Sequence, residues 1–217
     1  MGKLVLDISM SLDGFVAGPN PSLAEPLGEG GTGLHDWALA TRAWRESHGL
    51  EGGEENVDSK LVDELLAGRA ATIMGRRMFS GGAGPWAQDP NSNGWWGDDP
   101  PFHHPVFVLT HEAREPLEMR GGTTFTFVTD GIHAALEQAR AVAGERDVAV
   151  AGGATAAQQY LRAGALDELQ IHLVPVLLGG GTSLFGDGLS KPPGELECAS
   201  LVKSPSGTTH LTYNVLR

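Results

Sequence analysis

Two adjacent glycines, Gly152 and Gly153, stand where a short apolar run gives way to a helix-like segment, and the backbone there is suited to holding a phosphate. Residues 148–151 alternate valine and alanine, which predicts a buried strand. Because glycine lacks a Cβ atom, the amides of such a turn can approach a ligand closely. Thr155 and Gln158 have the spacing of a capping box, which predicts that a helix with exposed N–H groups begins here. A plain strand-to-helix turn has the same sequence features, so phosphate binding and a structural turn both stay open.

The same turn lacks two widespread nucleotide-binding patterns. Residues 152–155 do not form G-x-G-x-x-G, and the chain contains no G-x-x-x-x-G-K followed by Ser or Thr. Ordinary Rossmann and P-loop sites are therefore disfavoured.

A second apolar run, residues 71–74, ends at Gly75, Arg76 and Arg77. Adjacent arginines are notable in a chain with a formal net charge of −12, because a basic pair in an acidic chain indicates a specific local role. A guanidinium group can bind a phosphate through two parallel hydrogen bonds. Two solvated surface charges would give the same sequence, so this reading also stays open.

A third apolar run, residues 106–109, ends at Thr110 and His111, which again carry polar donors. The carboxyl ends of parallel strands lie at one edge of a sheet, so we expect this turn to lie near Arg76 and Gly152. The sequence therefore predicts that three strand ends converge on one anionic ligand.

These turns require a sheet covered by helices, and the rest of the pattern supplies both. Apolar or alternating runs predict strands at residues 3–9, 71–74, 106–109, 124–129, 148–151 and 168–174. Helical segments lie between them, and two alternating arms follow at residues 196–203 and 208–216. The sequence predicts one α/β domain, residues 1–217, with a mixed, mainly parallel sheet of about eight strands, helices on both faces and a C-terminal antiparallel hairpin.

Two carboxylates stand at predicted helix starts. Asp36 is expected to cap a helix that runs to about His48, and Asp58 is expected to cap a helix that ends at Gly68. In both cases the side chain would satisfy free backbone N–H groups.

The segment from residue 81 to 105 is loop-like and unusually aromatic, with three tryptophans. A long stretch without secondary structure is uncommon in a compact domain, which favours a lid, a binding loop or an interface. The adjacent His103 and His104 point apart in an extended chain, and no other His or Cys lies at ligand spacing. We therefore expect no metal site.

Composition narrows the classes of partner. With 27 acidic and 15 basic residues, the chain repels nucleic acid and anionic membranes, so we expect neither as a partner. No apolar run approaches the length of a membrane span. A single cysteine, Cys198, and the absence of a signal-peptide pattern favour a cytoplasmic protein.

The three turns, together with residues 11–18 and 174–181, resemble the dihydrofolate-reductase-like superfamily. Specifically, they resemble the branch typified by the reductase domain of bacterial riboflavin biosynthesis, over nearly the whole chain. The resemblance implies NADPH as cofactor. It places the 2′-phosphate of the cofactor among Gly75, Arg76, Arg77, Thr110 and His111.

The resemblance also implies where the rest of the cofactor lies. The pyrophosphate would lie on the glycine turn and the helix start after it, at Gly152, Gly153, Ala154 and Thr155. The nicotinamide would lie beside the loop that follows the first strand, near Ser9, Val16 and Ala17.

The sequence says less about the substrate-binding end of the predicted site than about the cofactor-binding end. Asp13 or Asp36 is the candidate catalytic residue, as a carboxylate that binds an amino-pyrimidine or helps to deliver a proton. The expected function is NADPH-dependent reduction, by hydride transfer, of a small and heteroaromatic substrate that is pteridine- or pyrimidine-like. The alternative is a non-catalytic nucleotide-binding protein with the same fold. The apolar strand at residues 168–178 and the Trp-rich segment favour a homodimer, as does the resemblance.

Overall fold

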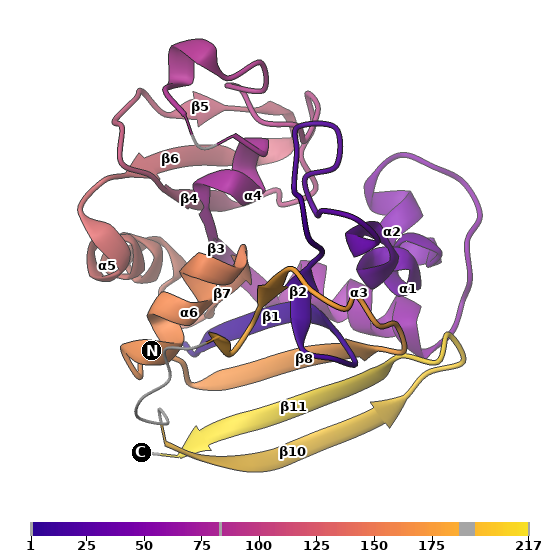
Figure 1. Ribbon diagram of the computed structural model, residues 1–217. Helices are drawn as coiled ribbons and strands as arrows, with labels where there is room; N and C mark the ends of the chain where they lie inside the picture. Colours follow the sequence, from indigo (N-terminus) through magenta and orange to yellow (C-terminus); the bar gives the residue numbers. More distant parts are fainter. Residues whose placement is uncertain (1, 83, 187–193, 217) are drawn as a thin grey trace.

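The computed structural model describes residues 2–82, 84–186 and 194–216, which form a nine-stranded mixed sheet and a small two-stranded one (Figure 1). The order across the large sheet is β10-β11-β8-β1-β7-β3-β4-β6-β5. Its parallel strands are β1 (Leu4–Ser11), β3 (Arg69–Gly75), β4 (Pro105–Leu109), β6 (Thr124–Val128), β7 (Asp147–Gly152) and β8 (Glu168–Val174). Its antiparallel strands are β5 (Leu117–Glu118), β10 (Glu195–Lys203) and β11 (Thr209–Leu216). The predicted fold class is confirmed, with one strand more than the predicted eight.

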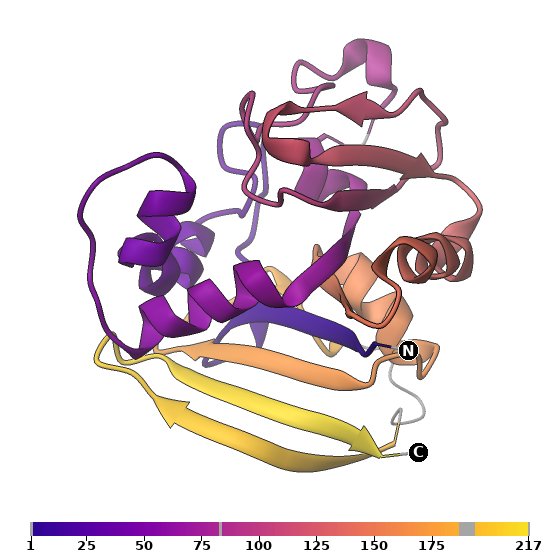
Figure 2. The same ribbon diagram turned by 180° about the vertical axis from the view of Figure 1, so that it is seen from behind.

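Helices cover both faces of the sheet, as predicted. One face packs against α5 (Gly131–Ala143) and α6 (Ala154–Arg162), where the buried ring of Tyr160 joins the strand residues Leu6 and Val150. The other face packs against α1 (Asp36–Leu39), α2 (Arg42–Ser47) and α3 (Val57–Gly68) at one end and α4 (Arg76–Ser80) at the other. Figure 2, the view from behind, shows α3 in front of β1 on this face.

The predicted helix through His48 is broken into three short pieces. A 3-10 turn, η1 (Gly31–His35), precedes α1, and α2 restarts after Thr41. Thr41 has an extended backbone and its side chain accepts a hydrogen bond from the Trp44 amide at 3.2 Å, so it caps a new helix. Asp36 is the first residue of α1 and makes no cap, so that prediction is wrong.

Two other predicted caps are also wrong. Asn56, not Asp58, caps α3, because its side-chain oxygen accepts hydrogen bonds from the amides of residues 58 and 59. At α6 the cap position is Gly153, and Gln158 donates instead to the Ser183 carbonyl at 2.7 Å. Asp58 and Gln158 reach distant partners that their own sequence neighbourhood cannot reveal.

The Trp-rich segment packs onto the sheet and covers the core of its second half. Trp86, Trp96 and Phe102 contact a buried cluster on α4, β4 and β6 that includes Phe79 and Phe125. Within the described ranges, no helix is both long and apolar enough to cross a membrane.

Candidate functional site

Three predicted turns lie side by side at one edge of the sheet. In the register of neighbouring strands, Met74 pairs with Gly152 and Gly75 pairs with Leu109. A Cβ atom added to Gly75 would lie 3.6 Å from the backbone nitrogen of Gly153, so these two turns are in contact. The carboxyl ends of β7, β3 and β4 therefore adjoin, as the sequence predicts.

The glycine turn combines a special backbone with open space. Gly152 has φ of +119°, which favours glycine, and the Gly152–Gly153 peptide bond is cis. A Cβ atom added to Gly153 would meet nothing within 4 Å. The first amides of α6, at Ala154 and Thr155, follow directly, and amides at a helix start have no partner within the helix. This turn can accept an anion on its backbone.

The guanidinium of Arg76 already has three partners in the structure. It pairs with Asp89 and Ser80 and stacks on the ring of Trp86, with 3.5 Å from its central carbon to the ring centroid. The Asp89 side chain is 2% exposed and that of Arg76 is 12% exposed. Burial would raise the pKa of Asp89, but hydrogen bonds from Ser80 and Arg76 hold it below its usual value. Arg77, the next residue, is exposed.

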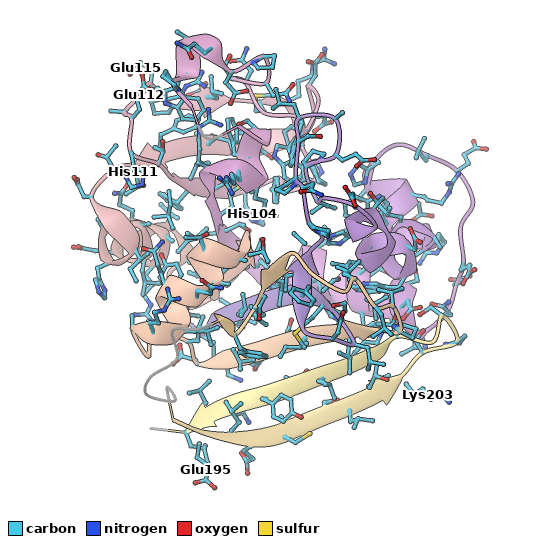
Figure 3. The ribbon with its side chains drawn as sticks, viewed as in Figure 1. His104, His111, Glu112, Glu115, Glu195 and Lys203 are labelled. Atoms are coloured by element: carbon cyan, nitrogen blue, oxygen red, sulfur yellow. The ribbon has the colours of Figure 1, made fainter. Side chains whose placement is uncertain are left out.

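Trp86 also holds the turn that follows β4. Its backbone amide donates to a Glu112 carboxylate oxygen at 3.1 Å and its indole N–H donates to the Glu112 carbonyl at 2.9 Å. Figure 3 shows His111 and Glu112 on the chain that leaves β4, and both side chains are exposed. The Trp-rich segment thus joins the turn at Arg76 to the turn at Thr110.

The residues assigned to the nicotinamide end lie on two strands. Ser9 is buried in β1 and its hydroxyl accepts a hydrogen bond from the Trp37 indole at 3.0 Å. Val16 and Ala17 form β2 (Phe15–Ala17), which pairs with β9 (Thr182–Ser183). Val16 is buried in the core.

The two candidate carboxylates have little in common. Asp13 accepts hydrogen bonds from the Ser11 hydroxyl at 2.6 Å and from the amides of Leu178 and Gly179 at 3.2 and 2.7 Å. The Ser11 bond, with the two amides, lowers the pKa of Asp13 below its usual value. Asp36 is exposed on α1. Asp13 ties two loops together, and the structure gives Asp36 no comparable contact.

Sequence reasoning missed a buried polar chain on the α3 face of the sheet. Asp7, His172, His210 and Asp58 follow one another through hydrogen bonds, and Arg69 binds the outer side of Asp7. The available signal was a set of titratable residues at inward positions of apolar strands, namely Asp7 in β1 and His172 in β8. In the part of the chain that the structure describes, no group of three or more His, Cys, Asp or Glu side chains is arranged to hold a metal.

The chain belongs to the RibD C-terminal domain family, whose model matches residues 2–210. The uncharacterized protein YyaP of Bacillus subtilis (strain 168) is 24% identical over 190 residues, which cover 85% of this chain and 81% of that protein. A provisionally assigned riboflavin biosynthesis protein of Shewanella sp. PV-4 has a similar structure, with a TM-score of 0.63, 22% identity and 99% of each chain covered. Dihydrofolate reductase of Enterococcus faecalis, solved with NADP(H), gives a TM-score of 0.53 at 15% identity, covering 100% of this chain and 98% of that one.

Proposed function

We propose that the protein is an NADPH-dependent reductase that transfers a hydride to a small pteridine- or pyrimidine-like substrate. The observation that carries the proposal is the contact between the turns at Gly75 and Gly153, beside the end of β4, in a member of the RibD C-terminal domain family. The dihydrofolate reductase of similar fold was solved with NADP(H), which supports the choice of cofactor.

The residues of the three turns suit different parts of such a cofactor. The amides from Gly153 to Thr155 would hold the pyrophosphate, because a helix start attracts an anion. The exposed Arg77 and His111 would face the 2′-phosphate. NADPH would supply the hydride, and the protein would orient the nicotinamide near Ser9 and exclude water.

One observation favours a second candidate, a nucleotide-binding protein without turnover. Asp13 is committed to the Ser11 hydroxyl and two backbone amides, and its pKa is lowered, so it is poorly suited to deliver a proton. A proton donor would then have to come from the substrate, from water or from another side chain.

Thermal unfolding with NADPH, with NADH and with buffer alone tests the cofactor. A ligand at one hundred times its Kd adds about 2.7 kcal/mol to the unfolding free energy. For a chain of 217 residues this raises the midpoint by roughly 5 to 10 °C. We expect a larger rise with NADPH than with NADH at matched concentration. No rise with either cofactor would overturn the proposal.

Turnover separates the two candidates. A panel of oxidised pyrimidines and pteridines would be screened for loss of NADPH absorbance, with enzyme-free samples as controls. A reductase consumes NADPH with at least one compound of these classes, whereas the second candidate shows the thermal shift without consumption.

A further inference from the structure

The buried polar chain contains a direct contact between two imidazole rings. His172 Nδ1 lies 2.8 Å from His210 Nδ1, and both side chains are at most 5% exposed. The other ring nitrogens face carboxylates, since His172 Nε2 lies 2.9 Å from Asp7 and His210 Nε2 lies 2.7 Å from Asp58. Four titratable groups are thus joined by three hydrogen bonds.

Those three contacts fix the number of protons. Each contact needs one proton between its two heavy atoms, and a carboxylate is an acceptor when ionised. With both carboxylates ionised, the two rings must carry three protons on their four nitrogens, so one ring is an imidazolium. With two protons, two Nδ1 lone pairs would face each other at 2.8 Å, and with four protons two N–H groups would collide there. The geometry accepts only the intermediate state.

The surrounding charges suit a single positive charge on the pair. Asp7 and Asp58 provide two negative charges and Arg69 one positive charge, 2.9 Å from Asp7, so one imidazolium makes the cluster neutral. Burial would raise the pKa of Asp7, but Arg69 and His172 keep this pKa below its usual range. Burial lowers the pKa of His210, although the hydrogen bond to Asp58 acts in the opposite direction.

Other titratable groups face the pair from neighbouring elements. His35 of η1 is close enough to interact electrostatically with Asp7 and His172, and burial lowers the pKa of His35, so it adds no competing charge near neutrality. Asp36 follows it on α1. Glu64 of α3 and Asp147 of β7 line a cavity of about 330 Å³ that also reaches both histidines.

The pair supports a residue that contacts the predicted site. The Trp37 ring lies 4.4 Å from the His172 ring in a tilted contact and 4.8 Å from the His210 ring in an edge contact, between centroids. A cation within about 6 Å of an indole ring can be attracted to it. The same indole donates its N–H to Ser9, at 3.0 Å. Ser9 is also the residue that pairs with His172 across β1 and β8.

We infer that His172 and His210 share one proton between Asp7 and Asp58. The charged pair holds Trp37 against Ser9. Both histidines are therefore positioning residues for the nicotinamide end of the site. The positioning role of the two histidines rests on the proposed function, whereas the shared proton is independent of it. Loss of that proton, or gain of a second one, breaks the Nδ1–Nδ1 bond and loosens Trp37.

Nuclear magnetic resonance of histidine labelled with nitrogen-15 tests the shared proton in the unaltered protein. We expect a scalar coupling between Nδ1 of His172 and Nδ1 of His210 near neutral pH, with three protons over their four ring nitrogens. Spectra of His172→Gln and His210→Gln assign the signals. Two neutral rings, or no coupling at any pH between 5 and 9, would overturn the inference.

NADPH binding tests the positioning role. His172→Gln or His210→Gln should weaken NADPH binding by about 2- to 30-fold, the usual range for residues that act through others. In the wild type, NADPH affinity should change over the same pH range in which the Nδ1–Nδ1 coupling disappears. Each variant should lack this change in affinity. Trp37→Phe should weaken binding similarly while the Nδ1–Nδ1 coupling persists.

The matched control is His48→Gln. His48 also stacks on a tryptophan, Trp44, with 4.1 Å between ring centroids, but it is exposed on the surface. It should leave both the coupling and NADPH binding unchanged. Wild-type affinity and pH profile in both histidine variants would overturn the positioning role. Absence of NADPH binding to the wild type would instead overturn the proposed function, and the resonance experiment would still decide the shared proton.

Discussion

Two adjacent arginines at the start of α4 have opposite environments. Arg76 is covered by Trp86 and paired with Asp89, whereas Arg77 is exposed and free of any ion pair to the described residues. A guanidinium that already donates to a buried carboxylate and a hydroxyl has fewer free N–H groups for a phosphate. Discrimination between NADPH and NADH should therefore depend on Arg77.

Arg77→Ala should weaken NADPH binding by about 10-fold and leave NADH binding nearly unchanged, since a hydrogen bond to a charged group contributes about 1.5 kcal/mol or more. Arg76→Ala should affect both cofactors equally and lower the unfolding midpoint. Dissociation constants from quenching of tryptophan fluorescence would measure both. The control is Arg120→Ala, an exposed arginine with a side chain 77% exposed. A selective loss of NADPH binding in Arg76→Ala would show that Arg76 leaves Asp89 on binding.

His104 should make stability depend on pH. Burial, with the charges of Arg69 and Arg146, lowers the pKa of His104 to about 4, and its Nε2 lies 2.8 Å from the Thr72 hydroxyl. In the unfolded chain the pKa is about 6.5, so the unfolded state binds more protons between these values and stability falls as the pH falls. The loss between pH 8 and pH 5 is about 2 kcal/mol for this residue.

Urea unfolding of the wild type and of His104→Gln at both pH values measures this contribution. The variant should lose less stability on acidification, by about 2 kcal/mol. His103→Gln alters the exposed neighbour and should behave as the wild type does. An equal loss in His104→Gln and the wild type would contradict the argument.

At the scale of elements, a buried ion pair between Arg76 and Asp89 anchors the Trp-rich segment to α4. Replacing Asp89 by Asn leaves the Arg76 charge without its partner in a site that is nearly closed to water, and such changes cost about 3 kcal/mol of unfolding free energy. Urea unfolding would show this loss. Asp98→Asn is the matched control, because the Arg120–Asp98 pair has side chains 77% and 84% exposed, and it should cost less than about 0.5 kcal/mol. Equal costs would mean that Asp89 does not anchor the segment.

Elements with a repeating pattern were predictable from the sequence, whereas their side-chain partners were not. The strands that end near Gly75, Thr110 and Gly152 were predictable because each is an apolar run followed by turn residues. Their ends lie together because the strands pair in parallel. Local spacing also suggested caps at Asp58 and Thr155. Both were wrong, because other residues occupy the cap positions and Asp58 binds His210, 152 residues away in the sequence.

The same limit applies to the site. The sequence predicts that Arg76 follows the end of a strand, but it cannot show that Asp89 neutralises the guanidinium, since that pair depends on how an irregular segment folds back. The Asp7–His172 contact likewise depends on the register between β1 and β8. A slip of one residue in either strand would put Asp7 and His172 on opposite faces of the sheet.

At the scale of the whole molecule, the sheet offers a second copy a free edge that does not include β8. Strand β8 pairs on both sides, with β1 and β11, so residues 168–174 offer no free edge. The sheet ends at β5 on one side and at β10 on the other, and in β10 Leu196 and Leu201 are 44% and 64% exposed. Figure 3 shows Glu195 and Lys203 at its two ends. An antiparallel pairing of two β10 strands would set these opposite charges against each other.

We therefore expect a homodimer formed through β10. Light scattering after size exclusion should give twice the chain mass of 22.8 kDa, and Leu201→Glu should give the single chain mass. Each chain has a net charge of −12, so added salt should tighten the dimer by screening repulsion between the copies. Val142→Glu changes a valine of α5 that is 52% exposed, and it should leave the dimer intact. A wild-type monomer at micromolar concentration and high salt would contradict the prediction, and a dimer that survives Leu201→Glu would place the interface elsewhere.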